Sequence, residues 1–131
     1  MDIIKVEKAL TVFWAGVLNK TVDGDIFRGG IPSGKNGIGV MLGIEITPNE
    51  PSMRKFNAQI LGKFTDRDVA LAILEKAEAA IPVYGVEAGM TGQKVFFRAI
   101  LKQGGSGAYR APEGGVITEF CSLNFTVCLD C

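Results

Sequence analysis

The sequence contains no histidine, so it lacks the side chain that most often acts as a general base near neutral pH and most often binds zinc. It also lacks net charge, because 14 lysines and arginines balance 14 aspartates and glutamates among 131 residues. A neutral chain has no overall field that would attract nucleic acid or an anionic membrane. We therefore expect no sequence-specific binding of nucleic acid and no membrane partner.

Cysteine is scarce, and its three copies, Cys121, Cys128 and Cys131, are crowded at the carboxyl end. An odd number in this position does not resemble the disulfide framework of a secreted domain, which indicates a reducing compartment. Cys128 and Cys131 have the spacing of a metal knuckle, but no second pair and no histidine complete the four ligands of a structural zinc. We expect no metal and no cofactor.

The apolar stretch over residues 1–20 is broken by Asp2, Lys5, Glu7 and Lys8, and no small-residue cleavage site follows it. It therefore fits neither a signal peptide nor a membrane span. Apolar residues nevertheless make up 47% of the chain, and the mean hydropathy is +0.25. These values are high for a monomer of this size, and they favour an apolar surface that is covered in an assembly.

Hydrophobic spacing predicts two helices. Residues 3–19 place apolar side chains three or four positions apart, on one helical face. These side chains are Ile3, Val6, Leu10, Phe13, Trp14 and Val17. A second helix over residues 66–80 follows Thr65 or Asp66 as the amino-terminal cap and stops before Pro82. Its predicted buried stripe consists of Val69, Ala72, Ile73 and Ala77.

Five segments predict strands, because they alternate in hydrophobicity or form short runs rich in Ile and Val. These segments are residues 25–29, 38–46, 55–64, 94–102 and 116–129. The glycine-containing segments 82–93 and 103–115 are expected to be loops. The order α-β-β-β-α-β-β predicts a single α+β domain over residues 1–131. We expect a mixed, mostly antiparallel sheet of about five strands flanked by two helices.

The stretch GGIPSGKNG at residues 29–37 differs by one residue from the phosphate-binding pattern G-x-x-x-x-G-K-[ST]. Such a loop works because its amides point at the ligand from the start of a helix, and because a hydroxyl after the lysine binds magnesium. Here Asn36 replaces the hydroxyl, and a predicted strand follows instead of a helix. An ordinary loop between strands is the favoured interpretation, with glycines supplying positive φ angles. Anion or nucleotide binding stays open as an alternative.

Taken in order, these segments resemble a known family of virion proteins. The amphipathic first helix, a strand ending in GGIP and two further strands are followed by the strand-helix unit FNAQILGKFTDRDVALAILEKAEAAI. An interrupted loop and a final strand containing CSLNFTV complete the layout. The layout is similar to that of the small tail-terminator (tail-completion, minor capsid) proteins of long-tailed bacteriophages and prophages. The similarity covers most of the chain, although the terminal cysteines and the glycine-rich 103–115 segment depart from it.

The resemblance implies a structural protein without catalytic activity. It implies a hexameric ring that caps the tail tube and meets the head-tail connector, so the partners would be further copies, the tube protein and the connector protein. The location would be the virion tail, after assembly in the bacterial host cytoplasm. The loops are the segments free to reach a neighbour, and their candidate interface residues are Lys35, Asn36, Tyr109, Arg110 and Glu113. A monomeric interaction adaptor is the remaining alternative.

Overall fold

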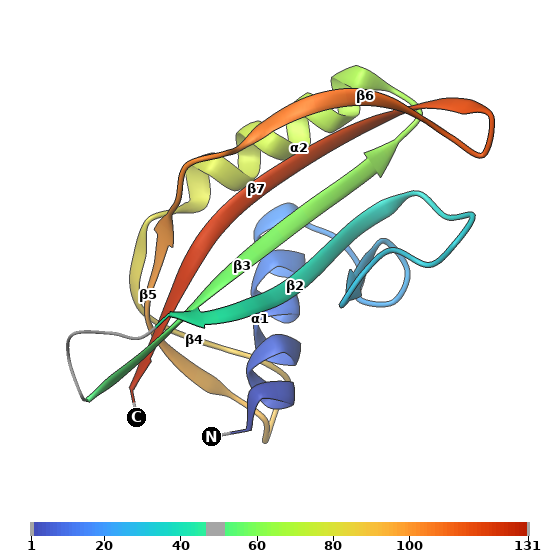
Figure 1. Cartoon of the computed structure of the whole chain (residues 1–131). Helices are drawn as coiled ribbons and strands as arrows, with labels where there is room; N and C mark the ends of the chain where they lie inside the picture. Colours follow the sequence, from blue (N-terminus) through green and yellow to red (C-terminus); the bar gives the residue numbers. More distant parts are fainter. Residues whose placement is uncertain (1, 47–51, 131) are drawn as a thin grey trace.

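The computed structural model describes residues 2–46 and 52–130, and within this part of the chain it contains two helices and one sheet of seven strands (Figure 1). The elements are α1 (Ile3–Leu18), β1 (Ile26–Arg28), β2 (Gly37–Ile46), β3 (Met53–Phe64), α2 (Arg67–Ala80), β4 (Val83–Ala88), β5 (Val95–Lys102), β6 (Gly107–Glu113) and β7 (Val116–Asp130). The predicted α+β class is confirmed.

The sheet has the strand order β1-β2-β3-β7-β5-β4, and only β1 and β2 run parallel. The last strand, β7, is the centre of the sheet. On one side it pairs with the whole of β3, and on the other side it pairs first with β6 and then with β5. The mixed, mostly antiparallel arrangement is as predicted from the sequence.

Two strands, β4 and β6, lie in segments that were expected to be loops. The β4 strand contains Gly85, which has a φ of 64° and interrupts the pairing with β5. The β6 strand contains Pro112, which an edge strand tolerates because one side of it needs no ladder hydrogen bonds. Gly114 and Gly115, with φ of 58° and 80°, turn the chain directly from β6 into β7. The expectation that residues 103–115 lack regular structure was therefore wrong.

Both helices cover the same face of the sheet (Figure 1), and the core lies between them and that face. Trp14 of α1 is fully buried and meets the Phe125 ring of β7 edge-on, with the ring centroids 5.2 Å apart. The cap of α2 agrees with the sequence: Asp66 accepts a hydrogen bond from the amide of Asp68 and begins the helix. At the start of α1, the carboxylate of Asp2 accepts from the amide of Lys5.

The predicted buried faces of the two helices needed correction at three positions. In α2, Val69 is 41% exposed and Ala72 is also exposed, because the helix turns Ala70, together with the predicted Ala77, into the core. Ile3 is 47% exposed, since it precedes the part of α1 that packs on the sheet. In β5, Phe97 and Ile100 both point into the core, because the pairing with β7 shifts register between Phe97 and Ala99. Strict alternation could not foresee this irregularity.

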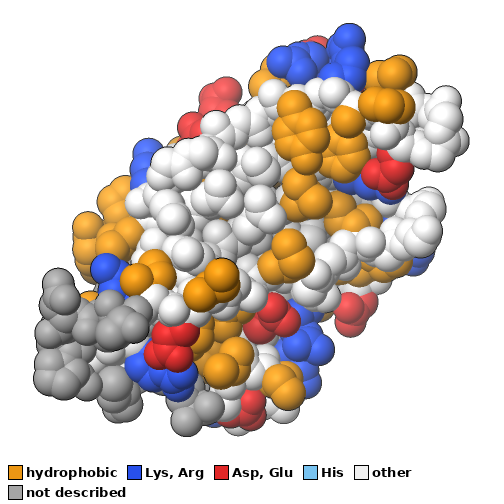
Figure 2. All heavy atoms as spheres, in the orientation of Figure 1, with side chains coloured by type: hydrophobic (Ala, Val, Ile, Leu, Met, Phe, Trp, Pro, Cys, Tyr) orange, Lys and Arg blue, Asp and Glu red, His pale blue; other side chains and the backbone are white. Residues whose placement is uncertain are grey.

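Within residues 2–46 and 52–130, the opposite face of the sheet carries no helix, and we call it the open face. The strand register places uncharged polar residues along its middle. They are Asn57, Gln59, Ser122, Asn124 and Thr126, all only half-buried. Figure 2 shows this face with few charged side chains over its centre. An uncovered, weakly charged sheet face is available for contact with another surface.

Candidate assembly interface

One row of residues crosses four neighbouring strands at the end of the sheet that carries the β6–β7 turn (Figure 1). Gly37 of β2 pairs with Lys63 of β3, Lys63 pairs with Phe120 of β7, and Phe120 pairs with Tyr109 of β6. With about 4.8 Å between strands, the row is roughly 14 Å long. The two predicted interface segments, 29–37 and 103–115, therefore reach the same end of the sheet.

Tyr109 and Phe120 form an aromatic pair on the open face. Their rings are stacked, with centroids 5.1 Å apart and planes 11° from parallel. Tyr109 is 48% exposed, and Val116, four residues before Phe120 on the same face of β7, is 60% exposed. We call Tyr109, Phe120 and Val116 the hairpin patch; Figure 2 shows hydrophobic side chains gathered at this end of the molecule. Exposed aromatic and aliphatic side chains on one face are typical of the anchors of protein interfaces.

Arg110 and Glu113, two of the predicted contact residues, are engaged within the chain. Arg110 donates from Nε to Glu119 at 2.7 Å, and Arg67 of α2 lies 3.6 Å from the other carboxylate oxygen. Glu113 pairs with Lys63. Since the Glu119 side chain is only 6% exposed, the two arginines compensate its charge and tie β6 and α2 to β7. Arg110 itself remains 59% exposed, so a partner can still reach it.

Lys35 and Asn36 lie on the exposed connection between β1 and β2. The Lys35 ammonium lies 5.8 Å from the centroid of the Phe27 ring, a cation-π contact that holds the lysine against β1 of the same chain. Gly29, Gly34 and Gly37 have positive φ, as predicted, and a Cβ on Gly37 would lie 2.6 Å from the carbonyl oxygen of Asp25. The loop leads into β2 and not into a helix, so it lacks the helix dipole that a phosphate-binding loop uses.

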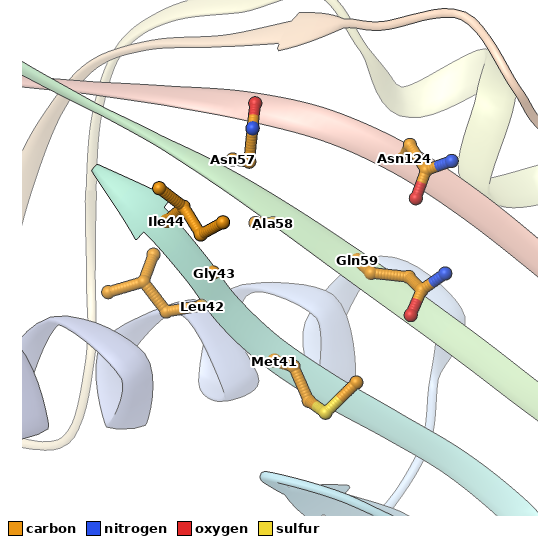
Figure 3. Close-up of a pocket in the computed structure, with 8 residues that line it drawn as sticks. All are labelled: Met41, Leu42, Gly43, Ile44, Asn57, Ala58, Gln59 and Asn124. Carbon is orange, nitrogen blue, oxygen red and sulfur yellow. The ribbon is translucent and has the colours of Figure 1, made fainter. Parts of the chain in front are cut away.

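The open face also has a shallow hollow of about 350 Å³ where β2, β3 and β7 meet (Figure 3). Amide side chains from Asn57, Gln59 and Asn124 border it, together with Met41 and Ile44. The Asn57 Oδ1 atom is buried and has no hydrogen-bond partner among the residues that the structure describes. The amide and apolar side chains of the lining suit packing and amide hydrogen bonds.

The two described cysteines are buried free thiols. Burial raises the pKa of the Cys121 thiol, although a backbone hydrogen bond with Gly62 opposes the shift. Burial also raises the pKa of Cys128, against the opposing charges of Lys55 and Arg98. Both thiols are therefore protonated and weakly reactive at neutral pH. Cys131 lies outside the described residues, and within those residues no three His, Cys, Asp or Glu side chains are grouped to hold a metal ion.

No family model and no curated protein matches this chain. Neither helix of residues 2–46 and 52–130 combines the length and the hydropathy needed to cross a bilayer.

The sequence analysis did not predict that Phe120, Lys63 and Glu119 lie beside the candidate interface residues at this end of the sheet. Their neighbours depend on strand register, which periodicity does not determine. One signal was present: the Gly114-Gly115 pair between alternating segments is typical of a tight hairpin turn. A hairpin at that point would have placed Tyr109 and Arg110 opposite Phe120 and Glu119.

Proposed function

We propose that this chain is a structural virion protein of a tailed bacteriophage or prophage. It would form a ring that terminates the tail tube and joins it to the head-tail connector, within a tail assembled in the host cytoplasm. The observation that most supports this proposal is the open face with the hairpin patch at one end. A sheet face without a covering layer, bordered by exposed aromatic and aliphatic side chains, is a surface suited to contacts with other subunits.

The composition of these surfaces supports a structural role. The hollow on the open face presents amides and a thioether, and the described cysteines are buried thiols. The chain has no net charge, so copies repel one another only weakly when they associate. The exposed apolar area is explained if it is buried in contacts with further copies, with the tube protein and with the connector protein, because monomeric proteins rarely expose large apolar patches.

The experiment that tests this function uses the hairpin patch. Purified protein is mixed with assembled tail tubes of the phage or prophage that encodes it, and tube-bound protein is measured by sedimentation. We expect the wild-type chain to sediment with the tubes, and a Tyr109→Ser/Val116→Ser variant to bind at least tenfold more weakly. Tyr84→Ser is the matched control, because Tyr84 is 70% exposed but lies on β4. If the hairpin variant binds tubes as well as the wild type, the hairpin patch is not the binding surface. If the wild-type chain does not bind tubes, the proposed function is refuted.

A further inference from the structure

Three hollows that share lining residues follow one another along the amino-terminal part of α1 and together make a groove-like row. The first, of about 380 Å³, includes Lys8 and Gln93, and the second, of about 270 Å³, shares both residues. The third, of about 330 Å³, shares Asp2 and Lys5 with the second. The groove runs between α1 and the β4–β5 turn, and we call it the α1 groove.

Exposed hydrophobic side chains line the α1 groove along its length. They are Val22 at 39% exposure, Met90 at 62%, Ile4 at 58% and Phe96 at 47%. Isolated exposed hydrophobic residues are normal on a protein surface, but a row of four that shares one groove indicates a contact surface.

The charges of the α1 groove are unbalanced in favour of lysine. Lys5, Lys8 and Lys94 line it, and none of the three makes an ion pair with any residue that the structure describes. The carboxylates of the groove are partly used within the chain: Asp2 caps α1, and Asp130 lies 3.7 Å from Arg98. Asp23 lines only the far end of the groove. An occupant should therefore carry carboxylates together with apolar side chains.

The outer face of α2 has this composition. Its acidic residues Asp68, Glu75 and Glu78 make no ion pair within residues 2–46 and 52–130. Leu71, which is 39% exposed, lies on the same side of the helix, because at 3.6 residues per turn Asp68, Leu71, Glu75 and Glu78 fall within about 80°. Val69, which is 41% exposed, and Lys76 are seven residues apart and lie together beyond the Asp68 edge of this surface. Three carboxylates with one leucine complement three lysines with four hydrophobic side chains.

The spacing of the charges also agrees. Lys5 and Lys8 are three residues apart on α1, and Glu75 and Glu78 are three residues apart on α2. At a rise of 1.5 Å per residue, each pair spans about 4.5 Å along its helix axis. Two helices that lie side by side can therefore bring both lysines to both glutamates at once.

We infer that the outer face of α2 of one copy docks into the α1 groove of a second copy of this chain. The two surfaces belong to different parts of the molecule, so a copy whose groove is filled still presents its α2 face. Such contacts close into a ring when the rotation between copies allows it, or form a reciprocal dimer about a two-fold axis. The inference names a contact for the proposed ring and in that respect rests on the proposed function, but its test needs no phage component.

The test measures self-association by sedimentation velocity over a concentration series. The wild-type chain is expected to associate, and Lys5→Glu/Lys8→Glu should weaken the association about tenfold or more. Glu75→Lys/Glu78→Lys should have a similar effect. The variant carrying all four substitutions exchanges the charges of the two surfaces and should restore association. The control Lys20→Glu/Lys102→Glu makes the same change in net charge outside both surfaces, and it should associate like the wild type.

The possible outcomes distinguish the docking contact, the closed ring and the proposed function from one another. The docking contact is refuted if the wild-type chain stays monomeric up to about 1 mM, or if the two reversal variants associate as well as the control. It is also refuted if both are weakened but the fourfold variant shows no recovery while its circular dichroism spectrum remains native. A closed dimer with the expected charge dependence would support the contact and contradict the ring. If the chain forms larger oligomers with the expected charge dependence but does not bind tail tubes, the docking contact is supported and the proposed function is refuted.

Discussion

Replacing Gly62 by alanine places a methyl group where two other side chains already lie. A Cβ at this position would be 2.5 Å from the Cys121 sulfur and 2.8 Å from the Phe64 ring. Gly62 and Cys121 are direct partners across β3 and β7, so neither backbone can move away without disturbing the centre of the sheet. Overpacking of this kind costs about 1–3 kcal/mol.

The expected loss can be measured by urea denaturation, followed by the fluorescence of Trp14. We expect Gly62→Ala to lower the free energy of unfolding by about 2 kcal/mol and the melting temperature by roughly 8 °C. Cys121→Ala should cost about 1 kcal/mol alone, because it removes one buried sulfur atom. In the double variant the sulfur is gone, so the loss should be smaller than the sum by about 1 kcal/mol, with the Phe64 contact remaining.

Two results would refute this reasoning. A Gly62→Ala variant as stable as the wild type would mean that the Cys121 sulfur and the Phe64 ring do not lie this close to the Cα of Gly62. Strictly additive losses in the double variant would mean that the Cys121 sulfur is not the atom that the new methyl group meets. Gly16→Ala serves as the control, because a Cβ there would meet nothing within 4 Å.

Three further predictions concern the chemical groups of the chain. Lys35→Ala should leave the fold intact, and calorimetry with ATP and magnesium should detect no binding; a dissociation constant below about 100 μM in the wild type would restore the nucleotide-binding alternative. Because burial raises the pKa of Cys121 and Cys128 in the folded state, the unfolded chain ionises first as pH rises, so stability should fall above the ordinary thiol range near pH 8.5. Denaturation midpoints that stay level up to pH 10 in the wild type, or that fall equally in a Cys121→Ala/Cys128→Ala variant, would contradict this. Elemental analysis of the purified protein should find no stoichiometric zinc, and one equivalent would contradict the interpretation of the terminal cysteines.

The elements with strong local signals could be predicted from the sequence. The amphipathic pattern of α1 and the cap at Asp66 of α2 are independent of the rest of the chain, and both are as expected. The alternation that predicts strands at residues 55–64 and 116–129 agrees with the burial in β3 and β7, where Phe56, Ile60 and Phe125 are buried. In these segments, local propensity and tertiary packing favour the same structure.

The remaining features depend on contacts between distant segments. Gly85 and Pro112 have low strand propensity, so the sequence predicts loops around them. Pairing of β4 with β5 and of β6 with β7 overrides this local preference at the edges of the sheet. The interface prediction had the same limit: Tyr109 and Arg110 were chosen as loop residues, whereas both belong to β6 and lie opposite Phe120 and Glu119. The α1 groove could not be foreseen, because it joins α1 to the β4–β5 turn across most of the sequence.

The most direct measurement of the central claim is electron cryomicroscopy of tail tubes incubated with the purified protein. The account predicts a closed ring of copies at one end of each tube, with the end of the sheet that carries Tyr109 and Phe120 in contact with the tube protein. Tubes with bare ends, from a sample in which the protein remains monomeric, would contradict it.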